Sequence, residues 1–148
     1  SREVWFAGCH SDIGGGYAEN ESALSKYPLR WMIQQAQLQG LSVNTTMFNH
    51  LVEGEARANS EHRYVAPNAM GQLHLSAIGG WLFLEWLPKK AKWQEWPKRK
   101  GFFGYYLPDC EPRLIPEGAV IHESVLWRKE AVAEYQPVNL PSRYDVET

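Results

Sequence analysis

The sequence predicts an α/β fold, with one buried strand followed mostly by helices and long loops. Residues 4–7 are apolar without alternation, as in a strand that is covered on both faces inside a parallel sheet. Residues 29–38 repeat apolar side chains at helical spacing and end before a glycine. Residues 89–113 are basic, aromatic and rich in turn residues, which is typical of a long surface excursion. We therefore expect one globular unit over residues 1–148.

The first element is the strand of residues 4–7, after which His10, Ser11 and Asp12 follow in a predicted loop. A residue just past a rigid strand is held firmly while its side chain still reaches solvent, so catalytic groups are commonly placed there. A parallel partner strand needs a crossover of about a dozen residues or more, and residues 119–121 are a weak candidate. We therefore expect the C-terminal part of a larger fold, in which this strand otherwise stays an exposed edge or pairs with a second copy.

The next element is a helix over residues 25–38. Pro28 suits its first turn, where the missing N–H costs nothing, and Gly40 stops it. Its apolar side chains predict the face that packs on the core. Leu29, Ile33 and Ala36 share that face, and Trp31, Met32 and Leu38 widen it.

A second helix is predicted over residues 73–87 and ends at Pro88. Gly79 and Gly80 lie inside it, and each costs about 1 kcal/mol relative to alanine, which we expect close backbone packing to offset. His74 on this mainly apolar helix is expected to be a structural histidine whose hydrogen bonds are satisfied.

The remaining segments carry weaker patterns. Residues 53–63 are polar and predict a loop or an irregular helix. Residues 121–128 predict a short helix, and residues 135–141 predict an extended terminus that prolines hold in place.

The composition favours a globular protein and excludes several classes. With 44% hydrophobic residues and seven Trp, the chain can bury a sizeable core. Its net charge of -2 gives no overall attraction to nucleic acid, so we expect no nucleic-acid partner. Cys9 and Cys110 form no disulfide framework, which favours a cytoplasmic location. No signal segment opens the chain, and its longest apolar run, residues 81–84, is far below the roughly 20 residues of a membrane span.

The histidines do not predict a metal site or another cofactor. The spacings of His50, His62, His74 and His122 fit no known ligand pattern. A metal bound by His10 and Asp12 is a weaker alternative, and we expect no metal.

Residues 4–17, with the sequence VWFAGCHSDIGGGY, resemble the signature of an uncharacterised α/β-hydrolase family. That family includes fungal proteins and the type VI secretion phospholipase effectors of bacteria. The resemblance covers nearly the whole chain, and its downstream pattern is closer to the fungal members. The further matching motifs are LRWM at residues 29–32, HLS at 74–76, GGW at 79–81, EWLP at 85–88, IP at 115–116, IHESV at 121–125 and YQPVNLP at 135–141.

The resemblance implies the C-terminal portion of an α/β-hydrolase-like fold and a serine hydrolase, either an esterase or phospholipase-like, with a Ser-Asp-His catalytic triad. His10 occupies the place of the triad histidine, which in that fold comes last along the chain. As general base, His10 would take the proton of the serine hydroxyl and pass it to the leaving group.

The sequence departs from the family pattern because it has no Gly-x-Ser-x-Gly nucleophile motif. The nucleophile and the acid are therefore expected before residue 1, and the 148 residues alone are expected to lack esterase activity. The expected partners are the N-terminal remainder of the domain and an ester or lipid substrate. The alternative is a non-catalytic binding or scaffold module that derives from the hydrolase fold.

Two interpretations stay open for the neighbours of His10. Asp12 could orient His10 or bind substrate, but a side chain that bonds its own turn is favoured. Gly14 and Gly15 could bring backbone N–H groups to an oxyanion or a phosphate, although a tight turn is favoured. Ser11 is expected to have a capping role.

The basic segment combines cations with indole rings, which predicts peripheral contact with a lipid surface. Each cation near an anionic membrane contributes about 1 kcal/mol, and indole prefers the interface. The favoured alternative is a solvated loop whose tryptophans pack on the body of the protein. The residues concerned are Lys89, Lys90, Lys92, Trp93 and Trp96.

Overall fold

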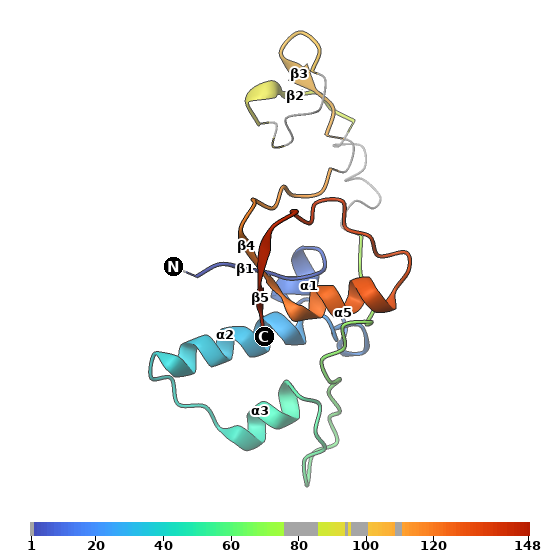
Figure 1. Cartoon of the computed structure of the whole chain (residues 1–148). Coiled ribbons are helices and arrows are strands. Elements are labelled where there is room, and N and C mark those ends of the chain that lie inside the picture. The colour runs from blue at the N-terminus through green and yellow to red at the C-terminus, as the bar shows by residue number, and fades with distance from the viewer. Residues whose placement is uncertain (1, 76–85, 94, 96–100, 109–110) are drawn as a thin grey trace.

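The computed structural model describes residues 2–75, 86–93, 95, 101–108 and 111–148. Helices alternate there with short strands, and a small parallel sheet lies among the helices (Figure 1). The elements in chain order are β1 (Val4–Trp5), α1 (His10–Gly14), η1 (Glu19–Glu21), α2 (Lys26–Leu38), α3 (Thr45–Leu51), β2 (Lys89–Lys90), η2 (Ala91–Trp93), β3 (Tyr105–Tyr106), β4 (Ala119–His122), α5 (Glu123–Ala131) and β5 (Tyr144–Glu147).

The parallel sheet has three strands in the order β1-β4-β5. Val4 pairs with Val120, and β4 pairs with β5 along its whole length. The weak candidate at residues 119–121 is therefore confirmed as the partner of the first strand. The first strand is therefore not alone, because β4 pairs with it within the same chain; among the described residues β1 still forms an outer strand of this sheet. Mixed helices and a parallel sheet confirm the α/β class in this coarse form.

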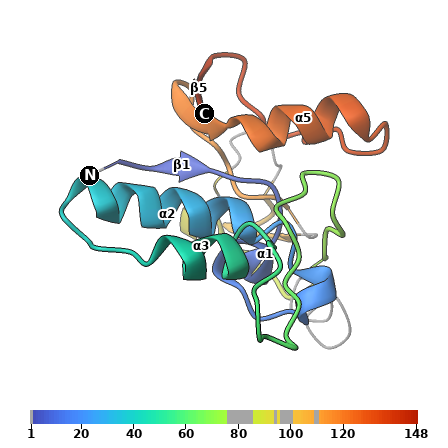
Figure 2. The ribbon, with the colours of Figure 1, turned by 90° about the horizontal axis from the view of Figure 1, so that it is seen from below.

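The buried core lies where β4 meets α5. Ala7, Ile121 and Val125 form its centre. Around them pack partly buried side chains from both ends of the chain, namely Trp5, Ile115, Ala119, Tyr135, Leu140 and Tyr144. Helix α2 runs beside β1 (Figure 2). The rings of Phe6 and Trp31 pack edge to face there, with their centroids 6.1 Å apart.

The helix predicted at residues 25–38 is confirmed as α2, but its predicted core face is confirmed only in part. Leu29, Met32 and Leu38 are exposed, Leu38 by 74%. Trp31 is buried as predicted, and the other buried side chains are Lys26, Tyr27 and Pro28, which the apolar pattern did not include.

Polar anchors explain which face of α2 is buried. The indole N–H of Trp31 donates to Glu147 Oε1 over 2.8 Å. Lys26 pairs with Glu19 at 2.8 Å and donates to the carbonyl of Leu51. These buried polar groups need their partners, so they fix the rotation of the helix against its apolar stripe.

The predictions for the other segments are confirmed in part. Helix α5 begins at Glu123, two residues later than the segment 121–128, because the first two of those residues complete β4. Residues 53–63 contain neither helix nor strand, as the loop interpretation predicts. Residues 135–141 contain a turn and lead into the unpredicted strand β5. The short helix α3 was also unpredicted; Asn44 caps it by accepting from Met47 N–H.

Most of the helix predicted at residues 73–87 lies outside the described residues, including Gly79 and Gly80. Residues 73–75, which are described, are not helical, so His74 does not lie on a helix as expected. No helix in the described part of the chain combines the length and apolar character needed to cross a membrane.

Candidate active site

Helix α1 starts where the chain leaves β1, and it turns a carboxylate back toward that strand. Cys9 is the N-cap, His10 is the first helical residue, and Asp12 is the third. Asp12 Oδ2 accepts the backbone N–H of Cys9 over 3.0 Å, and the residue is only 1% exposed. The predicted bond of Asp12 to its own turn is therefore present, in a short helix rather than the expected loop.

Gly8 makes room for this carboxylate. Its φ is +120°, and a Cβ added there would lie 2.3 Å from Asp12 Cβ. At the other end of α1, Gly15 has a φ of +80° and donates its N–H to the carbonyl of Ser11 over 3.0 Å. Glycine thus allows both the burial of Asp12 and the tight turn that ends α1.

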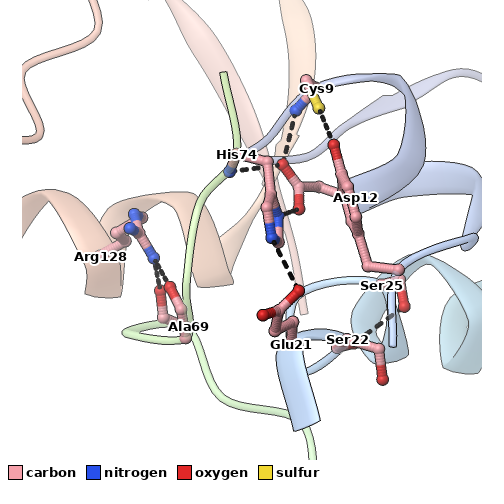
Figure 3. A network of polar contacts seen from close by, with 10 residues as sticks. Cys9, Asp12, Glu21, Ser22, Ser25, Ala69, His74 and Arg128 are labelled. Atoms are coloured by element: carbon pink, nitrogen blue, oxygen red, sulfur yellow. Dashed lines mark hydrogen bonds and ion pairs between the residues drawn. The ribbon is translucent and has the colours of Figure 1, made fainter. Parts of the chain in front are cut away.

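His74 is the second partner of Asp12, from a distant part of the sequence. Its Nδ1 lies 2.7 Å from Asp12 Oδ1, and its backbone N–H donates to Oδ2 over 3.2 Å (Figure 3). The ring stacks on Tyr17 with centroids 3.5 Å apart, and the side chain is 13% exposed. Asp12 therefore fixes both the position and the orientation of this imidazole.

The segment that carries His74 is anchored from α5. The Arg128 guanidinium donates to the carbonyls of Ala69 and Gly71, both over 2.7 Å (Figure 3). This charge-assisted pair of bonds holds the chain just ahead of His74.

Hydrogen bonding favours an ionised Asp12. Burial raises the pKa of its carboxyl, but the bonds from His74 and Cys9 outweigh burial, so the pKa lies below the usual value. An ionised carboxylate at Nδ1 assigns the Nδ1–H tautomer to a neutral His74 and leaves Nε2 as an acceptor. Nε2 is buried; among the described residues no group hydrogen-bonds it, and Glu21 Oε2 is 3.7 Å away.

His10 lies on the same cavity wall but without an acid partner. Its side chain is exposed, and no hydrogen bond joins it to another described residue. Both oxygens of Asp12 are directed to Cys9 and His74 rather than to His10. The role of His10 as general base stays a prediction.

A cavity of about 780 Å³ opens beside these groups. Its wall is mostly apolar, with a few polar groups that include both histidines, as is typical of small-molecule sites. The lining residues that matter here are Cys9, His10, His74, Ile121, Val125 and Leu140.

Cys9 is a free thiol that contacts the ring stacked on His74. Its Sγ lies 3.3 Å from the Tyr17 hydroxyl. This bond to Cys9 is the main cause that raises the pKa of Tyr17 to about 12, so the phenol stays neutral beside the imidazole. Ser11, expected to cap a helix, lies inside α1 instead, and the cap position belongs to Cys9.

Two other histidines have structural partners. His50 Nδ1 contacts the carbonyl of Glu55 at 2.7 Å, and His122 Nδ1 contacts Ser124 Oγ at 2.8 Å. Within the described ranges, no three His, Cys, Asp or Glu side chains gather as metal ligands would.

The segment that carries Asp12 is similar to a known family of phospholipase catalytic domains. Residues 1–35 match the family described as T6SS, phospholipase effector Tle1-like, catalytic domain. That stretch includes β1, α1 and Asp12, and it ends before His74.

A relative covers more of the chain. The uncharacterised protein YEL023C of Saccharomyces cerevisiae is 23% identical over 94% of this chain. The chain spans 29% of the length of that relative. No solved structure matches. The likeness to a phospholipase catalytic domain and the α/β class are thus consistent with a lipase-like hydrolase.

Proposed function

We propose that this chain supplies the acid and the base of a lipase-like ester hydrolase, with Asp12 as the acid and His74 as the base. The observation that carries the proposal is the 2.7 Å contact between the buried Asp12 Oδ1 and Nδ1 of His74, a residue that lines the cavity. A buried carboxylate that orients an imidazole is the arrangement that general-base hydrolysis requires.

The chemistry follows from the tautomer that Asp12 imposes. His74 Nε2 takes the proton of a serine hydroxyl as its oxygen bonds to the ester carbonyl carbon, and ionised Asp12 stabilises the resulting imidazolium. The imidazolium then gives this proton to the departing alkoxide as the ester C–O bond breaks. Water repeats the sequence on the acyl-enzyme and releases the carboxylic acid.

The serine itself is assigned to a segment outside these residues. The sequence contains no Gly-x-Ser-x-Gly motif, and the chain spans 29% of its yeast relative. We expect a fluorophosphonate probe to label the complete protein and to leave the isolated 148 residues unlabelled.

The test compares histidine variants of the complete protein on a soluble p-nitrophenyl ester. We expect His74→Ala to lower kcat on the order of a thousandfold, and Asp12→Asn at least a hundredfold. His10→Ala and the exposed control His62→Ala are expected to stay within a few-fold of the parent. A large loss in His10→Ala with an active His74→Ala would instead assign the base to His10.

Glu21 supports a second candidate function, a non-catalytic scaffold. Its carboxylate lies 3.7 Å from His74 Nε2, which is buried, so it occupies the neighbourhood of the atom that the hydrolase proposal assigns to the serine. In a scaffold, His74 would bridge two carboxylates and hold residues 69–75 to α1. Fluorophosphonate would then leave the complete protein unlabelled, while Asp12→Asn would still lower the Tm.

A further inference from the structure

A tight hairpin turn at the start of β3, the strand that pairs with β2, carries two exposed phenylalanines. Phe102 and Tyr105 bridge across a two-residue turn, with N–H to carbonyl distances of 2.7 and 3.0 Å. Phe103 and Gly104 form the turn, and Phe102 and Phe103 are 77% and 87% exposed. Their ring centroids are 4.4 Å apart, so the two rings contact each other. The hairpin lies apart from the body of the protein (Figure 1).

The backbone at the tip has a conformation that bulky residues rarely adopt. Both turn residues have positive φ, 49° for Phe103 and 78° for Gly104, as a type I′ turn requires. Asparagine is the residue that best suits the first of these positions, whereas a bulky side chain there is strained. The tip therefore carries a large apolar ring where local stability favours a small polar residue, so stability of the hairpin does not account for Phe103.

Two lysines and an indole ring lie on the segment that pairs with the tip, where Lys90 is opposite Tyr105 and Ala91 N–H donates to the carbonyl of Gly104. Lys90 and Lys92 are exposed, and the Lys92 ammonium lies 4.9 Å from the ring centroid of Trp93, which is 67% exposed. By sequence, residues 89–108 contain six Lys or Arg and one Glu, although the chain as a whole has a net charge of -2. Trp96, also expected at a lipid surface, lies outside the described residues.

We propose that this hairpin docks the protein on an anionic bilayer, with Phe102 and Phe103 inserted below the headgroups. The lysines then face lipid phosphates and Trp93 lies at the interface, which is the distribution that membrane surfaces favour. Charge complementarity selects an anionic lipid surface over a second copy of this chain, whose net charge is only -2 and whose own tip is equally basic. The inference stands apart from the Asp12–His74 pair, since binding is measured without turnover.

The experiment is vesicle sedimentation of the complete protein. Vesicles of phosphatidylcholine alone are compared with vesicles of phosphatidylcholine and phosphatidylserine in equal parts. We expect binding to the anionic vesicles, weakened by salt, and at least a tenfold loss of partitioning in Phe102→Ser/Phe103→Ser and in Lys90→Glu/Lys92→Glu. Leu38→Ser, at an apolar residue on α2 that is 74% exposed, is the matched control and should bind as the parent does.

Phe103→Asn separates docking from folding. Asparagine tolerates the left-handed backbone, so the Tm should stay equal or rise while partitioning falls. Absence of binding by the parent, or binding that the serine variants leave unchanged, would overturn the proposal. So would a dimer that the same variants dissociate without affecting vesicle binding, because the tip would then bind a second copy.

Discussion

Gly8 is the residue on which the position of the Asp12 carboxylate depends. Its left-handed φ of +120° and the 2.3 Å approach of Asp12 Cβ leave no room for a side chain. We expect Gly8→Ala to lower the free energy of unfolding by about 2 kcal/mol or more and to displace Asp12 from His74. Urea denaturation and ester hydrolysis by the complete protein would both report the change.

Gly14 offers the matched control for this substitution. No atom lies within 4 Å of a Cβ built on Gly14, so Gly14→Ala should leave both stability and activity nearly unchanged. Equal effects of the two alanine substitutions would contradict the special role of Gly8.

His122 is expected to make stability depend on pH. Burial is the main cause that lowers its pKa to about 4, from a usual value of 6.5, and the nearby Arg30 charge adds to it. Between these two pH values the unfolded chain binds the proton more readily than the folded one. Stability is therefore lost as the pH falls from about 6.5 to 4, by up to about 1.4 kcal/mol per pH unit.

His122→Asn isolates this contribution, because asparagine keeps an N-cap acceptor for Ser124 N–H but does not titrate. Urea denaturation at a series of pH values should show a flatter slope for the variant in that window. His10→Asn, at an exposed position, serves as the control. An unchanged slope in His122→Asn would assign the acid sensitivity to other groups.

At the scale of elements, Glu117 holds the loop that precedes β5 against the start of β4. Its carboxylate accepts the N–H and the hydroxyl of Ser142 and the N–H of Arg143, over 3.1, 3.0 and 2.9 Å. These bonds, those from Ser142 first, lower the pKa of Glu117. We expect Glu117→Ala to speed hydrogen exchange of the β5 amides, with α3 amides as the internal reference and Glu117→Gln intermediate. Unchanged β5 exchange would show that sheet pairing alone holds this strand.

Helix α2 shows which part of an element the sequence predicts. Pro28 and Gly40 gave its limits correctly, because end signals act locally. The apolar stripe predicted the buried Trp31 but also the exposed Leu29, Met32 and Leu38. The partners that fix the buried face are Glu19 and Glu147, which a helical pattern does not include.

Strand β5 was missed for a related reason. Its Val146 is 48% exposed, whereas Glu147 is buried and paired with Arg2 and Trp31. The burial pattern reverses what hydropathy predicts for these two neighbours. A strand whose inward residue is a paired carboxylate carries no apolar signal.

For the whole molecule, the candidate site could be predicted only in part. The sequence drew attention to Asp12 and to the glycines around it, because a strand end followed by a turn is a local pattern. The pairing of Asp12 with His74 joins residues 62 positions apart, so it depends on the tertiary fold. His10 was favoured as the base because it lies within the motif that resembles the family signature, whereas Asp12 contacts the distant His74.

The order of strands in the sheet has a consequence for folding during translation. The central strand β4 and its neighbour β5 are among the last parts of the chain, whereas β1 is among the first. During translation β1 must leave the ribosome long before residue 119 exists to pair with it. Such long-range parallel pairing is slow, so we expect β1 to stay without this partner strand until residues 119–122 have been made.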